Sequence, residues 1–491
     1  MEGVVAAGHP LTAEAGAQVL RAGGNAVDAA LAAMAASFVA EPQLTGLGAG
    51  GYMLVAERGE PPALLDFFVA APGYGAGPAQ RAPLVAAEVF FGAVAQVFHV
   101  GAASCGVYGT PAGICEAHRR YATVPLEKLV APAAALARAG VEVNAQQAYI
   151  FDLLEPITAT TPEARAKYWI GERVAREGDT LRDPELADAL ERLGAEGAAP
   201  FYTGDVAQTV CAWLAERGGA LTLEDLARYE TIAREPIQVR YRGHDVFTNP
   251  PPSAGGLLIA YVLALLDREP RPPSPARLVA AMEQAHRART PEFLEGLDRP
   301  GFREEFMASQ LGSTTHISVL DANGDACAVT CTNGEGSGIV VPGTGLHVNN
   351  MMGEQDLSPL GFFTHPPGRR LPSMMCPTAV ARDGEVELAL GSAGSNRIRS
   401  AILQVIVGVL DHGLDVQAAI DAPRVHVEDG VAYVEPGLDT GALEEEQRTI
   451  VRFAARNLFF GGAQAVQRDL GTGSLTGGGD PRRGGAVAIA T

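Results

Sequence analysis

Residues 312–333 have the pattern of a β-hairpin, around which the rest of the chain can be placed. The stretches 317–320 and 326–332 are rich in β-branched and apolar residues. Between them, residues 321–325 read Asp-Ala-Asn-Gly-Asp, which is typical of the turn that joins two antiparallel strands. Taken alone, such a hairpin indicates structure rather than catalysis.

The length of this turn decides which residues of the hairpin face each other. With a three-residue loop in which Gly324 adopts the left-handed conformation, Thr314 falls opposite Thr332. With a two-residue Asn-Gly loop, Thr315 falls opposite Thr332 instead. Cross-strand threonine pairs are ordinary stabilisers of sheets, so a purely structural explanation stands beside any functional one.

The composition favours a large enzyme-like globule with many turns. The chain has 491 residues, of which 47% are hydrophobic and 19% are charged, and it contains 58 glycines and 33 prolines. Its formal net charge is −20, and no cluster of Lys and Arg is present. Because nucleic-acid binding depends on such clusters, we expect no nucleic-acid partner.

No segment has the pattern of a targeting or membrane-spanning sequence. The first residues are strand-like rather than the basic and apolar regions of a signal peptide, and no apolar run is long enough to span a bilayer. The six cysteines lack CxxC spacing, so we interpret them as reduced core residues. We therefore expect a cytoplasmic protein without a membrane partner.

Two patterns that suggest a bound group are better explained without one. Residues 46–51 match G-x-G-x-x-G, but they follow a helical pattern and precede a strand, the reverse of the order in a dinucleotide site. The ten histidines show no HxxH or HExxH spacing, and His316 is interpreted as a packed or hydrogen-bonded neighbour of Thr314. We predict neither a cofactor nor a metal.

The rest of the chain alternates between helical and strand patterns. Asn25, with an aspartate three residues later, predicts the capped start of a buried apolar helix. Residues 150–235 indicate a helical lobe that covers the core, and residues 268–313, rich in Pro, Arg and Glu, indicate an exposed connector. Arg482 and Arg483 are interpreted as tying the C-terminal segment to the body rather than touching substrate.

Motifs along nearly the whole chain resemble those of the gamma-glutamyltransferase family of N-terminal nucleophile hydrolases. In the family's order, the matching segments are the hairpin and residues 23–30, 48–54, 109–126, 251–256, 349–350, 373–378, 391–397, 422–424 and 480–484. The resemblance implies a four-layer αββα sandwich of the α+β class, in which helices cover two stacked antiparallel sheets.

The resemblance gives the first strand of the hairpin a catalytic role. Cleavage between Ser313 and Thr314 would make Thr314 a new chain terminus, with its hydroxyl as nucleophile and its α-amine as base. An α-amine titrates at roughly pH 8, which suits a base. By resemblance, Thr332 orients the nucleophile, and the backbone N–H groups of Gly394 and Ser395 form the oxyanion hole. The family usually has two glycines there, so Ser395 is a departure.

The implied cleavage divides the chain into residues 1–313 and residues 314–491. The resemblance implies that the two fragments remain intertwined in one domain and form a heterodimer. The connector 268–313 would give the cut ends room to separate. The sequence leaves open whether heterodimers associate further.

The resemblance also locates the substrate pocket, and here the sequence departs from the family. The pocket is assigned to Phe68, Asn333, Met351, Glu354, Ser373 and Met374. Phe68 stands where the family has a carboxylate-binding arginine, and a phenyl ring cannot pair with a carboxylate. Glu354 corresponds to the aspartate that holds the substrate amine, while Met351 and Met374 replace polar residues. Arg370 and Arg397 are candidates to replace the missing arginine.

These observations predict an autoprocessed threonine-nucleophile amidohydrolase or acyltransferase. Its substrate is a small amide, and its acceptor is water or an amine. The acyl part is either gamma-glutamyl, as in glutathione, or a related group that depends less on a carboxylate. The alternative is a relative that has lost catalysis and serves as a binding or scaffold protein.

Overall fold

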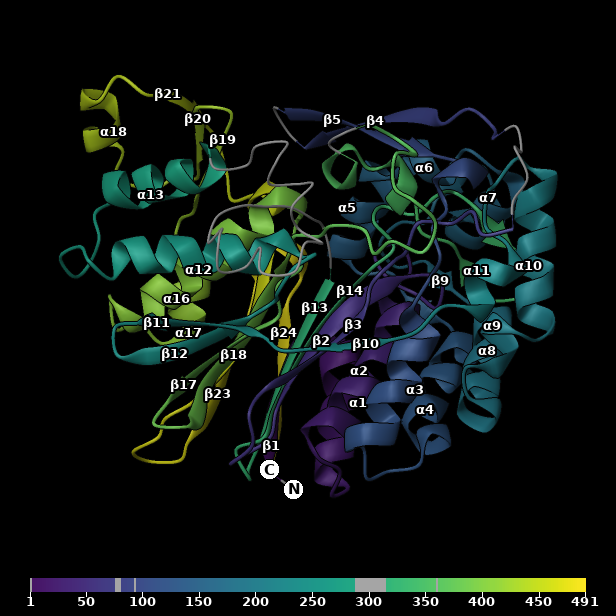
Figure 1. Ribbon diagram of the computed structural model, residues 1–491, viewed down its shortest axis with the longest axis horizontal. Helices are drawn as coiled ribbons and strands as arrows, with labels where there is room; N and C mark the ends of the chain where they lie inside the picture. The colour runs from purple at the N-terminus through teal and green to yellow at the C-terminus, as the bar shows by residue number, and fades with distance from the viewer. Residues whose placement is uncertain (1, 76–80, 92–93, 288–314, 359–360) are drawn as a thin grey trace.

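In the computed structural model, two antiparallel sheets stack face to face and helices cover their outer sides (Figure 1). The structure describes residues 2–75, 81–91, 94–287, 315–358 and 361–491. This arrangement confirms the four-layer αββα sandwich that the resemblance implied.

The hairpin lies in the middle of the first sheet. Over the described residues the strand order of this sheet is β10-β3-β2-β14-β13-β1-β24, with every neighbouring pair antiparallel. The bounds are β1 Gly3–Ala7, β2 Gly50–Ala56, β3 Ala63–Phe67, β10 Ile232–Arg234, β13 Thr315–Asp321, β14 Ala326–Thr332 and β24 Ala486–Ala490. Because other strands flank β13 and β14 on both sides, the two strands are buried along their whole length.

The register of the hairpin is the one predicted for the three-residue loop. Thr315 pairs with Cys331, and Gly324 in the turn has a φ of 94°. The alternative with Thr315 opposite Thr332 is therefore wrong. The predicted pair of Thr314 and Thr332 stays a prediction, because Thr314 lies outside the described residues.

The second sheet packs on the face of the hairpin to which Thr332 points. Its order is β11-β12-β17-β18-β22-β23, and β13 contacts β18 and β22 across the interface. The bounds are β11 Ile237–Tyr241, β12 His244–Thr248, β17 Thr378–Arg382, β18 Glu385–Ala393, β22 Gly462–Arg468 and β23 Leu475–Gly479. Since side chains alternate along a strand, Ala328 packs between the sheets and Val329 packs against helices, so Thr332 faces the second sheet.

Helices α1, α2 and α3 cover the outer face of the first sheet, with α2 directly on β13 and β14, while α4 packs on α2 and α8 packs on α4. Their bounds are α1 Pro10–Arg21, α2 Ala26–Ala40, α3 Thr110–Tyr121, α4 Leu126–Ala139 and α8 Pro184–Glu196. The predicted cap of α2 is confirmed, because Asn25 and Asp28 each accept the other's backbone N–H.

Helices on the second sheet overturn part of one prediction. They are α12 Ala254–Leu266, α13 Pro275–Arg287, α16 Ile398–Leu410 and α17 Val416–Asp421. We expected residues 268–313 to be an exposed connector, but α13 packs on α12 and buries Leu278, Val279 and Met282. Their spacing makes an apolar stripe, which the Pro, Arg and Glu around it obscured in the sequence. Residues 288–313 lie outside the described part.

The predicted helical lobe, residues 150–235, covers one end of the sandwich, and small two- and three-stranded sheets lie at the surface. The remaining elements are α5 Ala145–Leu153, α6 Glu155–Thr158, α7 Pro162–Tyr168, α9 Ala199–Tyr202, α10 Asp205–Glu216, α11 Leu223–Ala227, α18 Gly441–Glu445, β4 Val85–Phe91, β5 Val94–Val100, β6 Val141–Glu142, β7 Trp169–Ile170, β8 Arg173–Val174, β9 Thr180–Leu181, β15 Val340–Val341, β16 Leu346–His347, β19 Val425–Glu428, β20 Val431–Val434 and β21 Thr449–Arg452. All six cysteines are free, and all but Cys115 are buried. Among the described helices, none is both long and apolar enough to cross a membrane.

The cap of α2 predicts one stability effect. The buried Asp28 carboxylate accepts four hydrogen bonds, from Asn25 N–H, Thr123 N–H, Thr123 Oγ1 and Val124 N–H. Asp28→Ala strands these donors, so we expect the free energy of unfolding to fall by about 3 kcal/mol or more in urea titrations. Glu14→Ala removes an exposed ion pair with Arg21 and should cost less than about 1 kcal/mol. Equal losses in the two variants would contradict this account.

Candidate active site

The end of β14 presents the hydroxyl of Thr332 to the interior. Its Oγ1 accepts the backbone N–H of Gly334 at 2.7 Å, and the residue is 1% exposed. Over the described residues, the Thr332 hydroxyl proton has no recorded acceptor, and a hydroxyl can donate while it accepts. The proton is therefore available to the residue opposite, as the predicted orienting role requires. The predicted nucleophile Thr314 and the residue before it at the predicted cleavage site, Ser313, lie outside the described residues.

The predicted oxyanion turn follows β18, at the point where the chain enters α16. Gly394 has a φ of 122° and precedes a 3₁₀ turn, Ser395–Arg397, that continues into the helix. A Cβ on Gly394 would lie 2.6 Å from the Cα of Gly461, so only glycine fits there. Ser395 has a φ of 56°, in the left-handed region that favours glycine. Ser395, which stands where the family usually has a second glycine, is therefore also in a strained backbone conformation.

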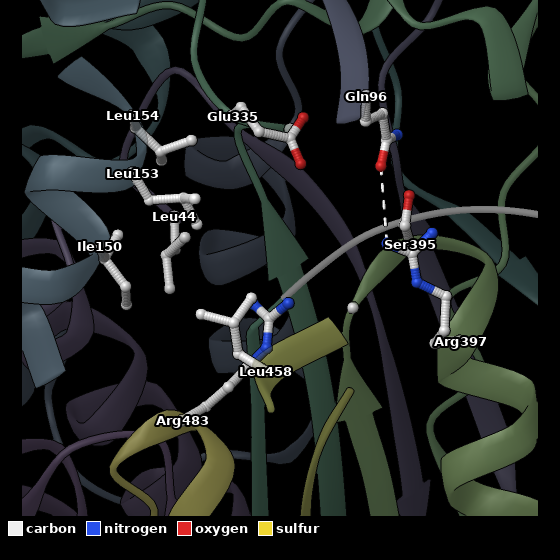
Figure 2. A pocket seen from close by; sticks show the side chains of 12 residues that line it. Leu44, Gln96, Ile150, Leu153, Leu154, Glu335, Ser395, Arg397, Leu458 and Arg483 are labelled. Carbon is white, nitrogen blue, oxygen red and sulfur yellow. Dashed lines mark hydrogen bonds between the residues drawn. The ribbon is translucent and has the colours of Figure 1, made fainter. Parts of the chain in front are cut away.

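Gly394 and Ser395 line a hollow at the surface of the sandwich (Figure 2). Its apolar side consists of Leu44, Ile150, Leu153, Leu154 and Leu458. Its polar side consists of Gln96, Glu335, Arg397 and Arg483, together with the backbone of Gly334, two residues after Thr332. A hydrogen-bonding turn, an apolar wall and charged groups thus meet in one cavity, which is the usual character of a small-molecule site.

Three of the predicted substrate residues lie in the core instead of this cavity. Phe68 is 1% exposed and stacks on Tyr52 with ring centroids 5.5 Å apart. Met351 and Met374 are also buried, and all three belong to the apolar cluster between and behind the sheets. Three positions at which the resemblance implies polar substrate contacts are therefore filled by packed apolar side chains. A substrate-binding role for these three side chains is not supported by their placement.

The three polar residues of the predicted substrate pocket do not lie together. Ser373 is fully buried, and its Oγ accepts the N–H of Met375 at 3.0 Å. Asn333 anchors the loop that carries Leu44 by donating its N–H to the Leu44 carbonyl at 2.9 Å. Glu354 lines a second hollow, which shares Gln96 and Arg397 with the first. Glu354 therefore lies next to the first cavity rather than within it.

The two arginines proposed as replacements differ in their surroundings. Arg370 places Nε 3.3 Å from an Asp66 carboxylate oxygen and lies over the ring of Tyr229, so it is engaged in the fold. Arg397 lines both hollows, with Nε bonded to the Phe459 carbonyl at 3.0 Å. Of the two, only Arg397 is placed at the cavity beside Gly394.

The C-terminal arginine pair has two separate roles. Arg482 is buried and forms ion pairs with Glu435 and Asp480, which confirms that it ties the tail to the body. Arg483, for which we predicted the same role, lines the cavity instead. The two residues belong to one 3₁₀ turn, Pro481–Arg483, in which successive side chains diverge. The sequence held no signal that could separate them, because only the contacts with Glu435 and Asp480 show which arginine is paired.

Two buried titratable groups support the hairpin next to the site. The Glu41 carboxylate accepts the hydroxyl of Thr315 at 3.0 Å and that of Thr12 at 3.4 Å. Burial raises the pKa of Glu41 to about 7, against the opposing effect of these two hydrogen bonds. His316 contacts Thr330 and Ser318 as a packed residue, and burial lowers its pKa to about 3, so it stays neutral.

Comparison with known proteins identifies the family. The model of the family described as Gamma-glutamyltranspeptidase matches residues 12–294 and 282–490. The chain belongs to the gamma-glutamyltranspeptidase family. It is therefore an enzyme that hydrolyses amides or transfers their acyl groups, with the fold of the N-terminal nucleophile hydrolases.

Family members that are named for different activities are about equally similar in sequence to this chain. The glutathione hydrolase proenzyme of Escherichia coli (strain K12) is 31% identical, over 87% of this chain and 81% of its own length. The acylase ACY 1 proenzyme of Pseudomonas sp. (strain SE83) is 30% identical, over 89% and 84%. The crystal structure of cephalosporin acylase from Bacillus halodurans superposes with a TM-score of 0.84, at 27% identity over 99% of this chain and 95% of that one.

The strain at the oxyanion turn predicts the effect of a substitution. Ser395→Gly removes the left-handed strain while keeping the backbone N–H, and the added flexibility of the unfolded chain offsets part of the gain. We expect the free energy of unfolding to rise by about 0.5–1 kcal/mol in urea titrations, with amide hydrolysis retained. Ser395→Ala keeps the strain and loses the hydroxyl, so it should not be stabilised. If Ser395→Ala were stabilised and Ser395→Gly were not, the explanation by backbone strain at position 395 would be wrong.

The carboxyl of Glu41 predicts a pH-dependent stability. Its folded pKa, about 7, exceeds the ordinary value of 4.5, so the folded state keeps a proton that the unfolded state loses. This contribution is complete below pH 4.5 and disappears as the pH rises towards 7, a difference of up to about 3 kcal/mol. Glu41→Gln stays neutral, so its stability relative to wild type should rise between pH 5 and pH 8 in urea titrations. Parallel profiles of the two proteins would rule this out.

Proposed function

We propose that the chain is a self-cleaving precursor whose Thr314 becomes the nucleophile of a small-molecule amidohydrolase or acyltransferase. The carrying observation is that the Gly394–Ser395 turn and the loop that follows β14, at Gly334 and Glu335, line one cavity. Maturation would leave a heterodimer of residues 1–313 and 314–491, in line with the word proenzyme in the names of relatives. A cytoplasmic location is part of the proposal, supported by the six free cysteines.

In the proposed reaction, the hydroxyl of Thr314 attacks the amide carbonyl and passes its proton to the α-amine of the same residue. Negative charge develops on the carbonyl oxygen, where the backbone N–H groups of Gly394 and Ser395 would stabilise it. One such donor typically contributes a factor of 10² to 10³ in rate. The leaving amine takes the proton as the C–N bond breaks, and an ester on Thr314 remains. Water then hydrolyses the ester, or a second amine accepts the acyl group.

Relatives named glutathione hydrolase and acylase lead us to consider two substrate classes for this chain: gamma-glutamyl amides such as glutathione, and other acyl amides. The burial of Phe68, Met351 and Met374 in the core supports an acyl amide over a group held as the family holds gamma-glutamyl. The leucines beside Gly394 provide a surface for an aliphatic acyl chain. A gamma-glutamyl amide stays the second candidate, because Glu354 is placed next to the cavity.

Mass spectrometry of the purified protein tests the proposal directly. Wild type should yield fragments of 313 and 178 residues and, with a panel of acyl 4-nitroanilides, an ester-linked mass increase on the smaller fragment. Thr314→Ala removes the attacking hydroxyl, so it should remain full length and inactive. Thr314→Ser keeps a hydroxyl and should still cleave. A wild-type chain that never cleaves would favour the non-catalytic scaffold.

A further inference from the structure

A strained residue carries one of the two proposed oxyanion donors, so the surrounding structure has to hold it in place. Ser395 has a φ of 56°, a conformation that residues other than glycine rarely adopt. Such conformations persist where neighbouring contacts fix them. The 3₁₀ turn supplies one backbone hydrogen bond, from the Arg397 N–H to the Gly394 carbonyl at 3.0 Å. That bond closes the turn on itself and does not tie it to another element.

The next residue, Asn396, ties the turn to strand β19. Asn396 is 3% exposed, and its Nδ2 donates a hydrogen bond to Oε1 of Glu428, the last residue of β19. A second link runs through Arg399. Its Nε donates to the Asn396 carbonyl at 3.3 Å, and its Nη2 donates to the Val427 carbonyl at 3.4 Å. Both the side chain and the backbone of Asn396 are therefore connected to the same strand.

Strand β19 is itself fixed to helix α16, into which the oxyanion turn leads. The side-chain amide of Gln404 accepts the Val425 N–H and donates to the Val425 carbonyl, both at 2.9 Å. One residue further along the strand, the fully buried His426 places Nδ1 2.9 Å from Oγ of Ser400, on the same helix. The strand is thus held to the helix at two points, and a carboxylate at its end is a rigid support for the turn.

Glu428 is ionised, which strengthens its hydrogen bond to Asn396. Its Oε2 lies 3.5 Å from Nε2 of His426. Burial raises the pKa of Glu428, but the contact with His426 and the charges of Arg397 and Arg399 outweigh burial and hold the pKa well below its ordinary value. Burial lowers the pKa of His426 to about 4, so this ring is neutral at neutral pH. A hydrogen bond to an ionised acceptor is roughly twice as strong as one between neutral groups.

We propose that Glu428 is a positioning residue for amide hydrolysis, because it holds the oxyanion turn in place through Asn396. The inference rests on the proposed function and adds to it a residue that acts without touching the substrate. With Glu428 in place, the N–H of Ser395 keeps the direction that the developing negative charge requires. Without it, Ser395 relaxes from its left-handed conformation and the N–H turns away. Glu428 also lines the second hollow, so a direct contact with substrate is the alternative.

Kinetics of matched variants test the inference on the 4-nitroanilide that wild type hydrolyses fastest. Glu428→Ala should lower kcat by roughly 10- to 100-fold, because part of one oxyanion donor's contribution is lost, and should leave KM within about threefold. Glu428→Gln keeps an oxygen that accepts the Asn396 amide, so it should retain most of the activity. Asn396→Ala should resemble Glu428→Ala, and the double variant should lose no more than either, since both remove the same bond.

The neighbouring acidic residue provides the control. Asp429 lines the same hollow as Glu428, but its carboxylate contacts His286 at 3.1 Å instead of the turn. Asp429→Asn removes this charge and should change neither kcat nor KM. A loss in this variant equal to that in Glu428→Ala would mean that negative charge in the hollow, and not the hold on the turn, is what the reaction needs.

A rescue experiment separates support of the turn from other roles of Glu428. Glycine adopts the left-handed conformation without strain, so in Ser395→Gly the turn depends less on being held. Adding Ser395→Gly to Glu428→Ala should therefore raise kcat at least about threefold above that of Glu428→Ala alone. A loss that Ser395→Gly does not relieve would contradict the inference, because neither a lost substrate contact nor a general loss of stability is repaired at position 395.

The two kinetic constants also decide between the roles. A rise in KM with an unchanged kcat would assign Glu428 to substrate binding, and full activity of Glu428→Ala would remove it from the reaction. In each case hydrolysis by wild type would leave the proposed function intact. A cleaved wild-type protein that hydrolyses no amide, gamma-glutamyl 4-nitroanilide included, would refute the proposed function and this role with it.

Hydrogen exchange covers the case in which Glu428→Ala fails to mature. In the Thr314→Ala background, which stays uncleaved, backbone amides of residues 394–398 should exchange roughly 10-fold faster when Glu428 is replaced by alanine, and at nearly the original rate when it is replaced by glutamine. Exchange over helix α1 should be the same in all three proteins, which would show that the fold is intact. Unchanged exchange over residues 394–398 in the alanine variant would contradict the inference without any measurement of activity.

Discussion

The register between β13 and β14 is the constraint on which the site depends. Thr315 pairs with Cys331, and this register turns Thr332 to the face towards the second sheet. The second sheet contains β18, which ends at Ala393 and leads directly into the Gly394 turn. A slip of one residue would turn Thr332 to the helical side, because side chains alternate along a strand. The neighbours β2 and β1 hold the register by pairing with the hairpin on both sides.

Features encoded by a few adjacent residues could be predicted from the sequence. The turn around Gly324 predicted the hairpin and limited its register to two alternatives, and Asn25 with Asp28 predicted the start of α2, because both are local hydrogen-bonding patterns. The sandwich and the family followed from motifs spread over the chain. Helix α13 was missed because its apolar stripe is short and lies among prolines and charges, so composition outweighed periodicity.

The limits of prediction at the site arise from contacts between distant segments. The sequence could tell that Phe68 cannot bind a carboxylate, but not that its ring stacks on Tyr52 inside the core. It could not distinguish Arg482 from Arg483 either. That distinction depends on Glu435 and Asp480, which bind Arg482 and so fix the turn that carries Arg483. A buried, fully paired cluster of this kind is rigid, and it positions its neighbour as firmly as it holds itself.

The order of strands in the first sheet has a consequence for a chain cut before Thr314. Strands β10, β3, β2 and β1 would belong to one product, and β14, β13 and β24 to the other, so ladders β2–β14, β13–β1 and β1–β24 would join the two. Strands of the two products would therefore alternate within one sheet. Neither product could dissociate without breaking the hydrogen bonds of these ladders, so we expect the cut chain to unfold as a single cooperative unit. A new terminus could thus appear in the middle of a finished core without loosening it.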